Sequence, residues 1–390
     1  MITANKKNYF LSQPHQPYFT LGVVNAVIMM LLFALSYKGI MSLEIDTLTF
    51  HSYSLIYLVF TNFFTGFLFT TFPRFNQTQV IAKKRYINIF YANILASILF
   101  ILGAFVSEII LIFAMFITLV SHYFIVRTLQ NIYTIAQTAD KSDSFWILNA
   151  VYFGLFGNVL FLLSQFFPLL LNAAINISFY LYLIFLAFSV AQRMIPFFSH
   201  SFAQKNSNFI KVVFLSFILE SLFSSLHFTL GKIVVDLFLA GSILKELLRW
   251  DLHPLQSPPI LWVLHLALFW LPTAFTFAAI SEIAEIFLDT SFYYLDVHLL
   301  AIGFLSTVLI GFGTRVILGH AGLSPHADKF ATKIFLTIQA VVLLRALYSI
   351  NIALGWELNF LFDLSFTAWL VLFVIWGVRY GKILILGSKA

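Results

Sequence analysis

The chain has 390 residues, of which 61% are hydrophobic and only 10% are charged, and its mean hydropathy is +0.94. A water-soluble domain carries about 25% charged residues, so this composition excludes a soluble enzyme and predicts a polytopic membrane protein. The net charge of +6 would suggest nucleic acid as the partner of a soluble protein. In a membrane protein the same charge is explained by basic residues kept on the cytoplasmic side, so we expect no nucleic-acid partner.

Twelve apolar stretches have the length of roughly 20 residues that a helix needs to cross a bilayer. The connections near Glu108, Pro168 and Gly231 are very short and predict tight helical hairpins. The sequence therefore predicts an all-α fold, a polytopic membrane helical bundle of about 12 transmembrane helices in a single integral membrane domain, residues 1–390. The predicted spans are 18–37, 50–72, 86–106, 107–128, 144–166, 168–194, 209–230, 231–249, 259–287, 292–319, 331–354 and 359–380.

The distribution of basic residues predicts the orientation of these spans. When both termini are placed in the cytoplasm, 19 of the 22 Lys and Arg residues fall on the cytoplasmic side. Only Lys38 and Lys232 fall outside, and Arg345 lies within a span. This asymmetry follows the positive-inside rule and would be lost if a helix were missing.

Two full charges are predicted near the middle of the membrane, Glu220 halfway along 209–230 and Arg345 halfway along 331–354. Each costs ~2.5 kcal/mol or more at the bilayer centre unless it is paired. One interpretation is a structural ion pair between two helices, and the other is a proton relay or an anion site. Glu220 and His227 are seven residues apart, which on a helix places them on one face about 10 Å apart, with Ser224 between them. That line is a candidate proton route, or equally a buried contact between helices.

The sequence contains no cysteine, which excludes disulfides, iron–sulfur clusters, thiolate zinc sites and covalently attached c-type haem. Imidazoles are then the main candidate metal ligands. The predicted topology sorts those at membrane depth, placing His51, His298 and His227 near the outer face and His265, His320 and His15 near the cytoplasmic face.

His298 and His320 are 22 residues apart on one predicted helix, a rise of ~33 Å, so they cannot share a metal. If these histidines are ligands, there are two centres. The outer one draws on His51 and His298, with His227 as a further candidate, and the inner one on His265 and His320, with His15. The alternative is that each histidine only forms a hydrogen bond near its helix end.

Five segments resemble those of the NnrS family, and they occur in the same order over nearly the whole chain. The most specific is the segment from His298 to Gly322, which ends in TRVILGHAG and is similar to the family's "TRVxLGHTG". The other four are 15–19 (HQPYF), the stretch from 51 to 73 that ends in GFLFTTFP, 192–199 (QRMIPFFS) and 261–265 (LWVLH).

The resemblance implies a haem- and copper-containing protein of the bacterial inner membrane, associated with nitric oxide metabolism and denitrification. It places His51, His265, His298 and His320 on histidines of the family pattern, and Arg193 and Arg315 on its arginines. Where the family has a second His and a Glu, this chain has Tyr53 and Ser54, so one ligand position is lost. A member of this kind binds haem without copper, or uses Tyr53 as a ligand or proton donor.

The absence of cysteine permits only non-covalent haem, so haem b is the expected cofactor, with copper as a second candidate. Arg193 and Arg315 lie near predicted cytoplasmic helix ends, where a guanidinium can form charge-assisted hydrogen bonds to haem propionates. The other interpretation is that they only anchor the spans at the cytoplasmic face.

Three functions follow from this sequence. The first is a haem-dependent protein that binds nitric oxide, and reduces it or protects against nitrosative stress, with a membrane electron donor as partner besides the lipid bilayer. The second is a twelve-helix secondary transporter, although the two halves show no matching Gly/Pro-broken helices of the kind that transporters use. The third is an assembly factor that delivers haem or copper.

The orientation can be tested directly. We expect a reporter fused after Ala390 to be active only in the form that works in the cytoplasm, because the basic residues hold that end inside. Activity of the periplasmic form there would contradict the orientation and the sorting of the histidines by side.

Overall fold

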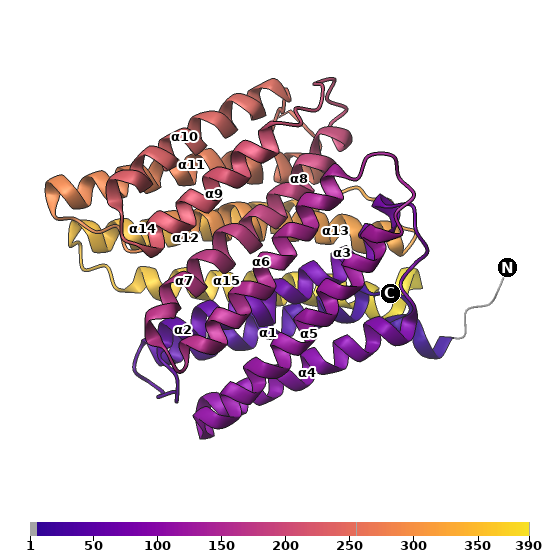
Figure 1. Ribbon diagram of the computed structural model, residues 1–390, viewed down its shortest axis with the longest axis horizontal. Helices are drawn as coiled ribbons and strands as arrows, with labels where there is room; N and C mark the ends of the chain where they lie inside the picture. The colour runs from indigo at the N-terminus through magenta and orange to yellow at the C-terminus, as the bar shows by residue number, and fades with distance from the viewer. Residues whose placement is uncertain (1–5, 255, 390) are drawn as a thin grey trace. The chain divides into compact units, whose positions relative to one another are not determined.

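The computed structural model describes residues 6–254 and 256–389, and within these ranges every regular element is a helix. Figure 1 shows these helices coloured along the chain. The long continuous ones are α1 (His15–Tyr37), α2 to α3 (Thr47–Phe75), α4 (Lys83–Val106), α5 (Glu108–Thr134), α6 (Ser142–Ser164), the segment containing α7 and α8 (Pro168–Phe198), α9 (Phe209–Ser225), α10 (Thr229–Arg249), α11 (Pro259–Leu288), α12 to α13 (Leu295–His320), α14 (Lys329–Leu354) and α15 (Phe360–Leu386).

Ten of these helices are long and apolar enough to cross a membrane. The remaining two are α9, which has 17 residues, and α10, which carries several charges including Lys232 and Asp236. Together they match the twelve predicted spans one for one, so the prediction of an all-α polytopic membrane bundle is confirmed. The placement of both termini in the cytoplasm stays a prediction, as does the single domain.

Three of the long helices contain a π-helical stretch, in which the backbone hydrogen bonds span five residues. These are η2 (Ser54–Phe60) between α2 (Thr47–Tyr53) and α3 (Thr61–Phe75), η4 (Ile177–Ile184) between α7 (Leu171–Asn176) and α8 (Phe185–Phe198), and η5 (Leu299–Ser306) between α12 (Leu295–His298) and α13 (Thr307–His320). Hydroxyl groups just beyond two of them bond to carbonyls five residues back, Thr61 to Ile56 at 2.8 Å and Thr307 to Ile302 at 3.1 Å. These contacts satisfy backbone groups that have no water to bind in a bilayer.

The chain forms two compact units. Unit 1 contains Met1–Leu183, Val316–Ser324 and Phe373–Ala390, and unit 2 contains Ile184–Arg315 and Pro325–Leu372.

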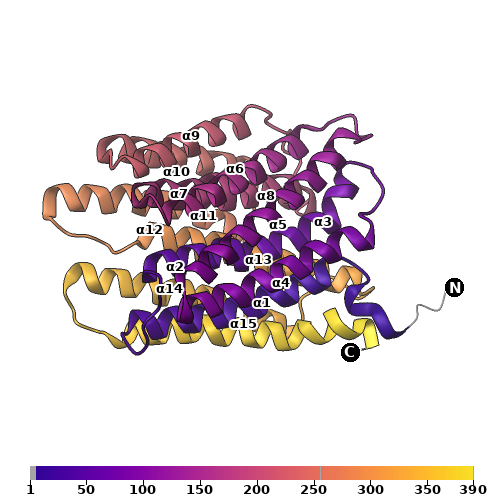
Figure 2. The same ribbon diagram turned by 60° about the horizontal axis from the view of Figure 1, so that its bottom comes forward.

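Close approach of helices in unit 1 depends on glycine. A Cβ at Gly103 of α4 would lie 2.4 Å from the backbone nitrogen of Leu111 in α5, because Ser107 alone separates the two helices. Figures 1 and 2 show α4 and α5 lying side by side as this hairpin. Small residues at such crossings allow the close packing that holds membrane helices together.

In unit 2 the hairpin of α9 and α10 packs against α11, and the three lie together in Figure 2. Helix α11 also packs on η5, where a Cβ at Gly303 would lie 2.7 Å from the Trp270 ring. Trp270 Nε1 donates a 2.8 Å hydrogen bond to Gln339 Oε1 of α14, so the indole N–H is satisfied inside the unit.

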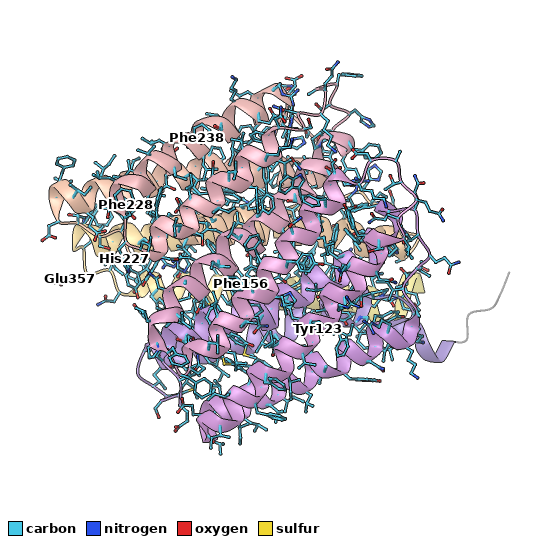
Figure 3. All side chains as sticks on the ribbon, viewed as in Figure 1. Tyr123, Phe156, His227, Phe228, Phe238 and Glu357 are labelled. Carbon is cyan, nitrogen blue, oxygen red and sulfur yellow. The ribbon has the colours of Figure 1, made fainter. Side chains whose placement is uncertain are left out.

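Large apolar side chains face outward along both units. Figure 3 labels Tyr123 on α5, Phe156 on α6 and Phe238 on α10, whose side chains are 47%, 50% and 51% exposed. In water such faces would aggregate, whereas lipid covers them without cost. The fold therefore supports a protein embedded in a bilayer.

The two glycines Gly103 and Gly241 provide a matched test of this packing. We expect Gly103→Ala to lower the unfolding temperature in detergent by several degrees, because the backbone of α5 must move to admit the methyl group. Gly241→Ala should leave it unchanged or raise it, because no atom lies within 4 Å of its Cβ position and alanine favours helix. Equal effects of the two substitutions would contradict the close crossing of α4 and α5.

Candidate functional site

In unit 1, residues distant in the sequence meet where α1 begins. His15 opens α1, and its backbone N–H donates a 3.2 Å hydrogen bond to Thr70 Oγ1 of α3. The residue before the helix, Pro14, provides no side-chain cap, so Thr70 satisfies one of the amides that a helix N-terminus leaves open. This bond holds the start of α1 against α3, and the His15 side chain is 2% exposed.

His320, the last residue of α13, lies against His15 with the two ring centroids 4.8 Å apart. Its Nδ1 forms a hydrogen bond to the Gln13 side-chain oxygen, and since that oxygen can only accept, Nδ1 carries the proton. Its Nε2 lies 3.3 Å from Arg74 Nη1 and accepts from it. His15 Nδ1 is buried without a hydrogen-bond partner among the described residues. The structure thus brings together two of the three histidines predicted for the inner centre.

The third, His265, belongs to unit 2 and is also buried. Its Nε2 lies 2.6 Å from Ser199 Oγ of the α8 end, and its Nδ1 lies 3.4 Å from Ser257 Oγ. The end of α8 and the beginning of α11 are joined by the first of these contacts.

The two predicted arginines also lie in unit 2. Arg315 of α13 is half-buried, and its guanidinium stacks on the Phe198 ring at 3.9 Å from the centroid. Arg193 is half-buried near the end of α8. Stacking holds the Arg315 plane while its N–H edges stay available for an anionic group.

The predicted outer histidines are divided between the units, His51 in unit 1 and His298 in unit 2. The His51 ring packs on Phe33 with centroids 3.9 Å apart. His298 Nδ1 donates a 2.8 Å hydrogen bond to the Tyr294 carbonyl. A shared outer centre stays a prediction.

The predicted line from Glu220 to His227 is wrong in its outer half. Helix α9 ends at Ser225, and His227 lies beyond it with a left-handed φ of 53°, so it does not continue the face of Glu220. Figure 3 shows His227 next to Phe228 in the turn that leads to α10. The inner half is present, because Ser224 Oγ donates a 3.1 Å hydrogen bond to Glu220 Oε1.

The ion pair between Glu220 and Arg345, one of the two interpretations left open by the sequence, is not found among the described residues. Arg345 donates to Ser349 Oγ at 2.5 Å and its guanidinium lies over the Tyr348 ring, 5.2 Å from the centroid. Glu220 instead faces Asp236 of α10. Sequence reasoning missed Asp236, although an acid four residues after Lys232 in an apolar stretch was a readable signal.

A second residue that sequence reasoning left aside is His122 of α5. It is 1% exposed, and neither ring nitrogen has a hydrogen-bond partner among the described residues. Tyr57 and Tyr182 surround it, with ring centroids 5.9 Å and 5.3 Å away. Both tyrosines lie in π-helical stretches, η2 and η4, which occur often at functional sites.

Tyr53, which replaces a histidine of the family pattern, lies in the same aromatic cluster. Its ring centroid is 5.1 Å from that of Tyr57, and its hydroxyl lies 3.3 Å from Asn158 Oδ1. The hydroxyl of Tyr57 donates to the Gly154 carbonyl or to Ser178 Oγ, at 2.9 Å and 2.7 Å. The position of the lost ligand is therefore filled by a hydrogen-bonded phenol.

The described residues contain no group of three or more His, Cys, Asp or Glu side chains that could hold a metal ion. The ring centroids of His15 and His320 are 4.8 Å apart, so the two imidazoles contact each other directly.

A protein-family model described as NnrS protein matches residues 9–386 of the chain, which is nearly its whole length. Comparison with curated proteins gives no match. The segments that carry the resemblance are those that meet in the two units: 15–19, 66–73 and His320 in unit 1, and 192–199, 261–265 and Arg315 in unit 2.

Substitutions in the aromatic cluster test whether His122 is structural. An unpartnered buried polar group costs ~1–3 kcal/mol, so we expect His122→Leu to raise the unfolding temperature of the purified protein in detergent. Tyr57→Phe should lower it, because the Gly154 carbonyl and Ser178 lose a partner. If His122→Leu is destabilising as well, the imidazole holds a ligand or water in the native protein.

Proposed function

The chain belongs to the NnrS family, and we propose that it binds nitric oxide, or a closely related small ligand, at a b-type haem within the bacterial inner membrane. Its membership relates it in general terms to nitric oxide, and its helices make it a multi-pass membrane protein. The observation that carries the proposal is the meeting of His15 and His320, from opposite ends of the sequence, where α1 begins.

The surroundings of this pair suit a haem ligand. His320 is held at both ring nitrogens, by the Gln13 oxygen at Nδ1 and by Arg74 at Nε2, so it serves to position the candidate ligand, His15. His15 is buried with an unpartnered nitrogen, and Phe19 packs edge-on against its ring at a centroid distance of 5.9 Å. Arg74 is the cation beside the pair and is placed to bind a propionate.

When bound, the haem would supply an iron that can take up a diatomic ligand. His15 would hold that iron, His320 and Gln13 would orient the imidazole, and Arg74 would balance the propionate charge. The propionate roles expected for Arg193 and Arg315 in unit 2 stay predictions. Reduction of nitric oxide would also require a membrane electron donor, so the proposal is limited to binding.

The expected copper does not fit the described residues. Blue-copper sites use two histidines and a cysteine, whereas the chain has no cysteine and the described residues contain no group of three or more His, Asp or Glu side chains that could hold a metal ion. Tyr53 replaces a histidine of the family pattern, and its hydroxyl lies within hydrogen-bond distance of Asn158. This replacement also argues against copper. We therefore propose haem without copper.

Optical and EPR spectra of the purified protein, with metal analysis, test this proposal. We expect a Soret band that shifts when nitric oxide is added to the reduced protein. His15→Ala and His320→Ala should each weaken or shift that band, because one imidazole binds the haem and the other keeps that imidazole in position.

The matched control is His326→Ala, which changes an exposed loop histidine and should leave the spectrum intact. A purified, folded protein without haem would overturn the proposal. So would a haem spectrum that is indifferent to both His15→Ala and His320→Ala.

A further inference from the structure

Unit 2 contains a group of five charged side chains contributed by four helices. Glu220 comes from α9, Lys232 and Asp236 from α10, Glu282 from α11 and Asp296 from α12. Figure 2 shows α9, α10 and α11 side by side. Four carboxyl groups thus share one ammonium group, a balance that cannot persist inside a membrane protein if every carboxyl is ionised.

Lys232 forms hydrogen bonds with the two more exposed acids, Glu282 and Asp296. Its Nζ donates to Glu282 Oε1 at 2.8 Å and to Asp296 Oδ2 at 3.4 Å. Asp236 Oδ2 is 3.9 Å away, beyond hydrogen-bond range. The side chains of Lys232, Glu282 and Asp296 are 12%, 20% and 14% exposed, so this part of the group reaches the surface of the unit.

Glu220 and Asp236 form a deeper pair, and both are 0% exposed. Their carboxyl groups face each other within hydrogen-bonding reach. Ser224 donates to Glu220 Oε1, but Glu220 Oε2 and both oxygens of Asp236 receive no hydrogen bond from the described residues. An ionised carboxylate can only accept, so two facing carboxylates leave these oxygens unsatisfied.

We propose that Glu220 and Asp236 hold one proton between them and form a buried proton-binding site. A single proton turns the unsatisfied contact into an O–H···O⁻ hydrogen bond, which is among the strongest in proteins. It also removes the repulsion of two like charges that a low-dielectric interior cannot sustain. The remaining negative charge of the pair faces Lys232, whose Nζ lies 3.9 Å from Asp236 Oδ2.

The same arrangement of side chains provides a path for a proton from the surface of the unit to the Glu220–Asp236 pair. Glu282 and Asp296 meet the surface, Lys232 contacts both, and Lys232 is the charged group between them and Asp236. Loading is a proton transfer only: one O–H bond forms on the pair and one breaks in a hydronium ion or water at the exposed acids. When the pair holds no proton, its second negative charge draws Lys232 toward Asp236 and away from Glu282. The protonation state of the pair therefore controls the contacts of Lys232 with the two outer acids.

Infrared difference spectroscopy of the full chain in detergent, in H₂O against D₂O at neutral pH, tests the site without any cofactor. We expect a carboxylic acid C=O band that shifts in D₂O. Glu220→Gln and Asp236→Asn should each abolish it, because the acid that remains has lost its partner and becomes ionised beside Lys232. The control Glu285→Gln, an exposed acid on α11, should leave the band unchanged.

If a variant fails to fold, isotope labelling of the wild-type protein still tests the proposal. In the wild-type protein, ¹³C labelling of aspartate or glutamate carboxyl groups should shift the band. A wild-type protein without the band, or a band that persists in both variants, overturns the proposal. A band that disappears on adding sodium ions also overturns it, because the pair then binds a cation in place of a proton. None of these outcomes depends on haem or nitric oxide.

Discussion

The structure depends on one constraint: inside a bilayer every polar group must find its partner within the protein. The π-helical stretch η2 shows how strictly this holds. Its Leu58 carbonyl accepts from Asn62 and also from Asn25 of α1, each at 2.7 Å. Asn93 of α4 then donates to the Asn62 side-chain oxygen at 2.9 Å. A polar network therefore joins α1, α3 and α4 where apolar contact alone would not specify their register.

Against that background the unsatisfied groups stand out. His15 Nδ1, both nitrogens of His122, and the Glu220–Asp236 pair are buried without the partners that their neighbours have. Some amide and hydroxyl groups of the described residues, such as Gln16 Nε2 and Ser221 Oγ, are also buried without a partner, but the imidazoles and carboxyl groups are the ones that can bind a metal or a proton. The proposed haem ligand and the proposed proton site both rest on this contrast.

The two sites use different physics. At the His15–His320 pair, neutral hydrogen bonds to Gln13 and Thr70 position an imidazole, so the site depends on geometry. At the Glu220–Asp236 pair, charge is the controlling quantity, because one lysine cannot balance four acids. Losing a contact at the first site misplaces a ligand, whereas losing one at the second changes how many protons the protein holds.

Composition and length by themselves determined the membrane class, the helical fold and all twelve helices, because a span needs a fixed length of apolar sequence. The motif pattern also selected His15, His320, His265 and Arg315 as candidate site residues, and their roles stay predictions. Tertiary structure alone decided the partners. The sequence allowed an ion pair between Glu220 and Arg345 because of their similar depth, but depth does not say which helices are neighbours, and Glu220 faces Asp236. It extended α9 to His227 by periodicity, whereas the helix ends at Ser225 because the chain must turn into α10. Contacts between helices depend on how their faces pack, and a one-dimensional pattern carries no record of that.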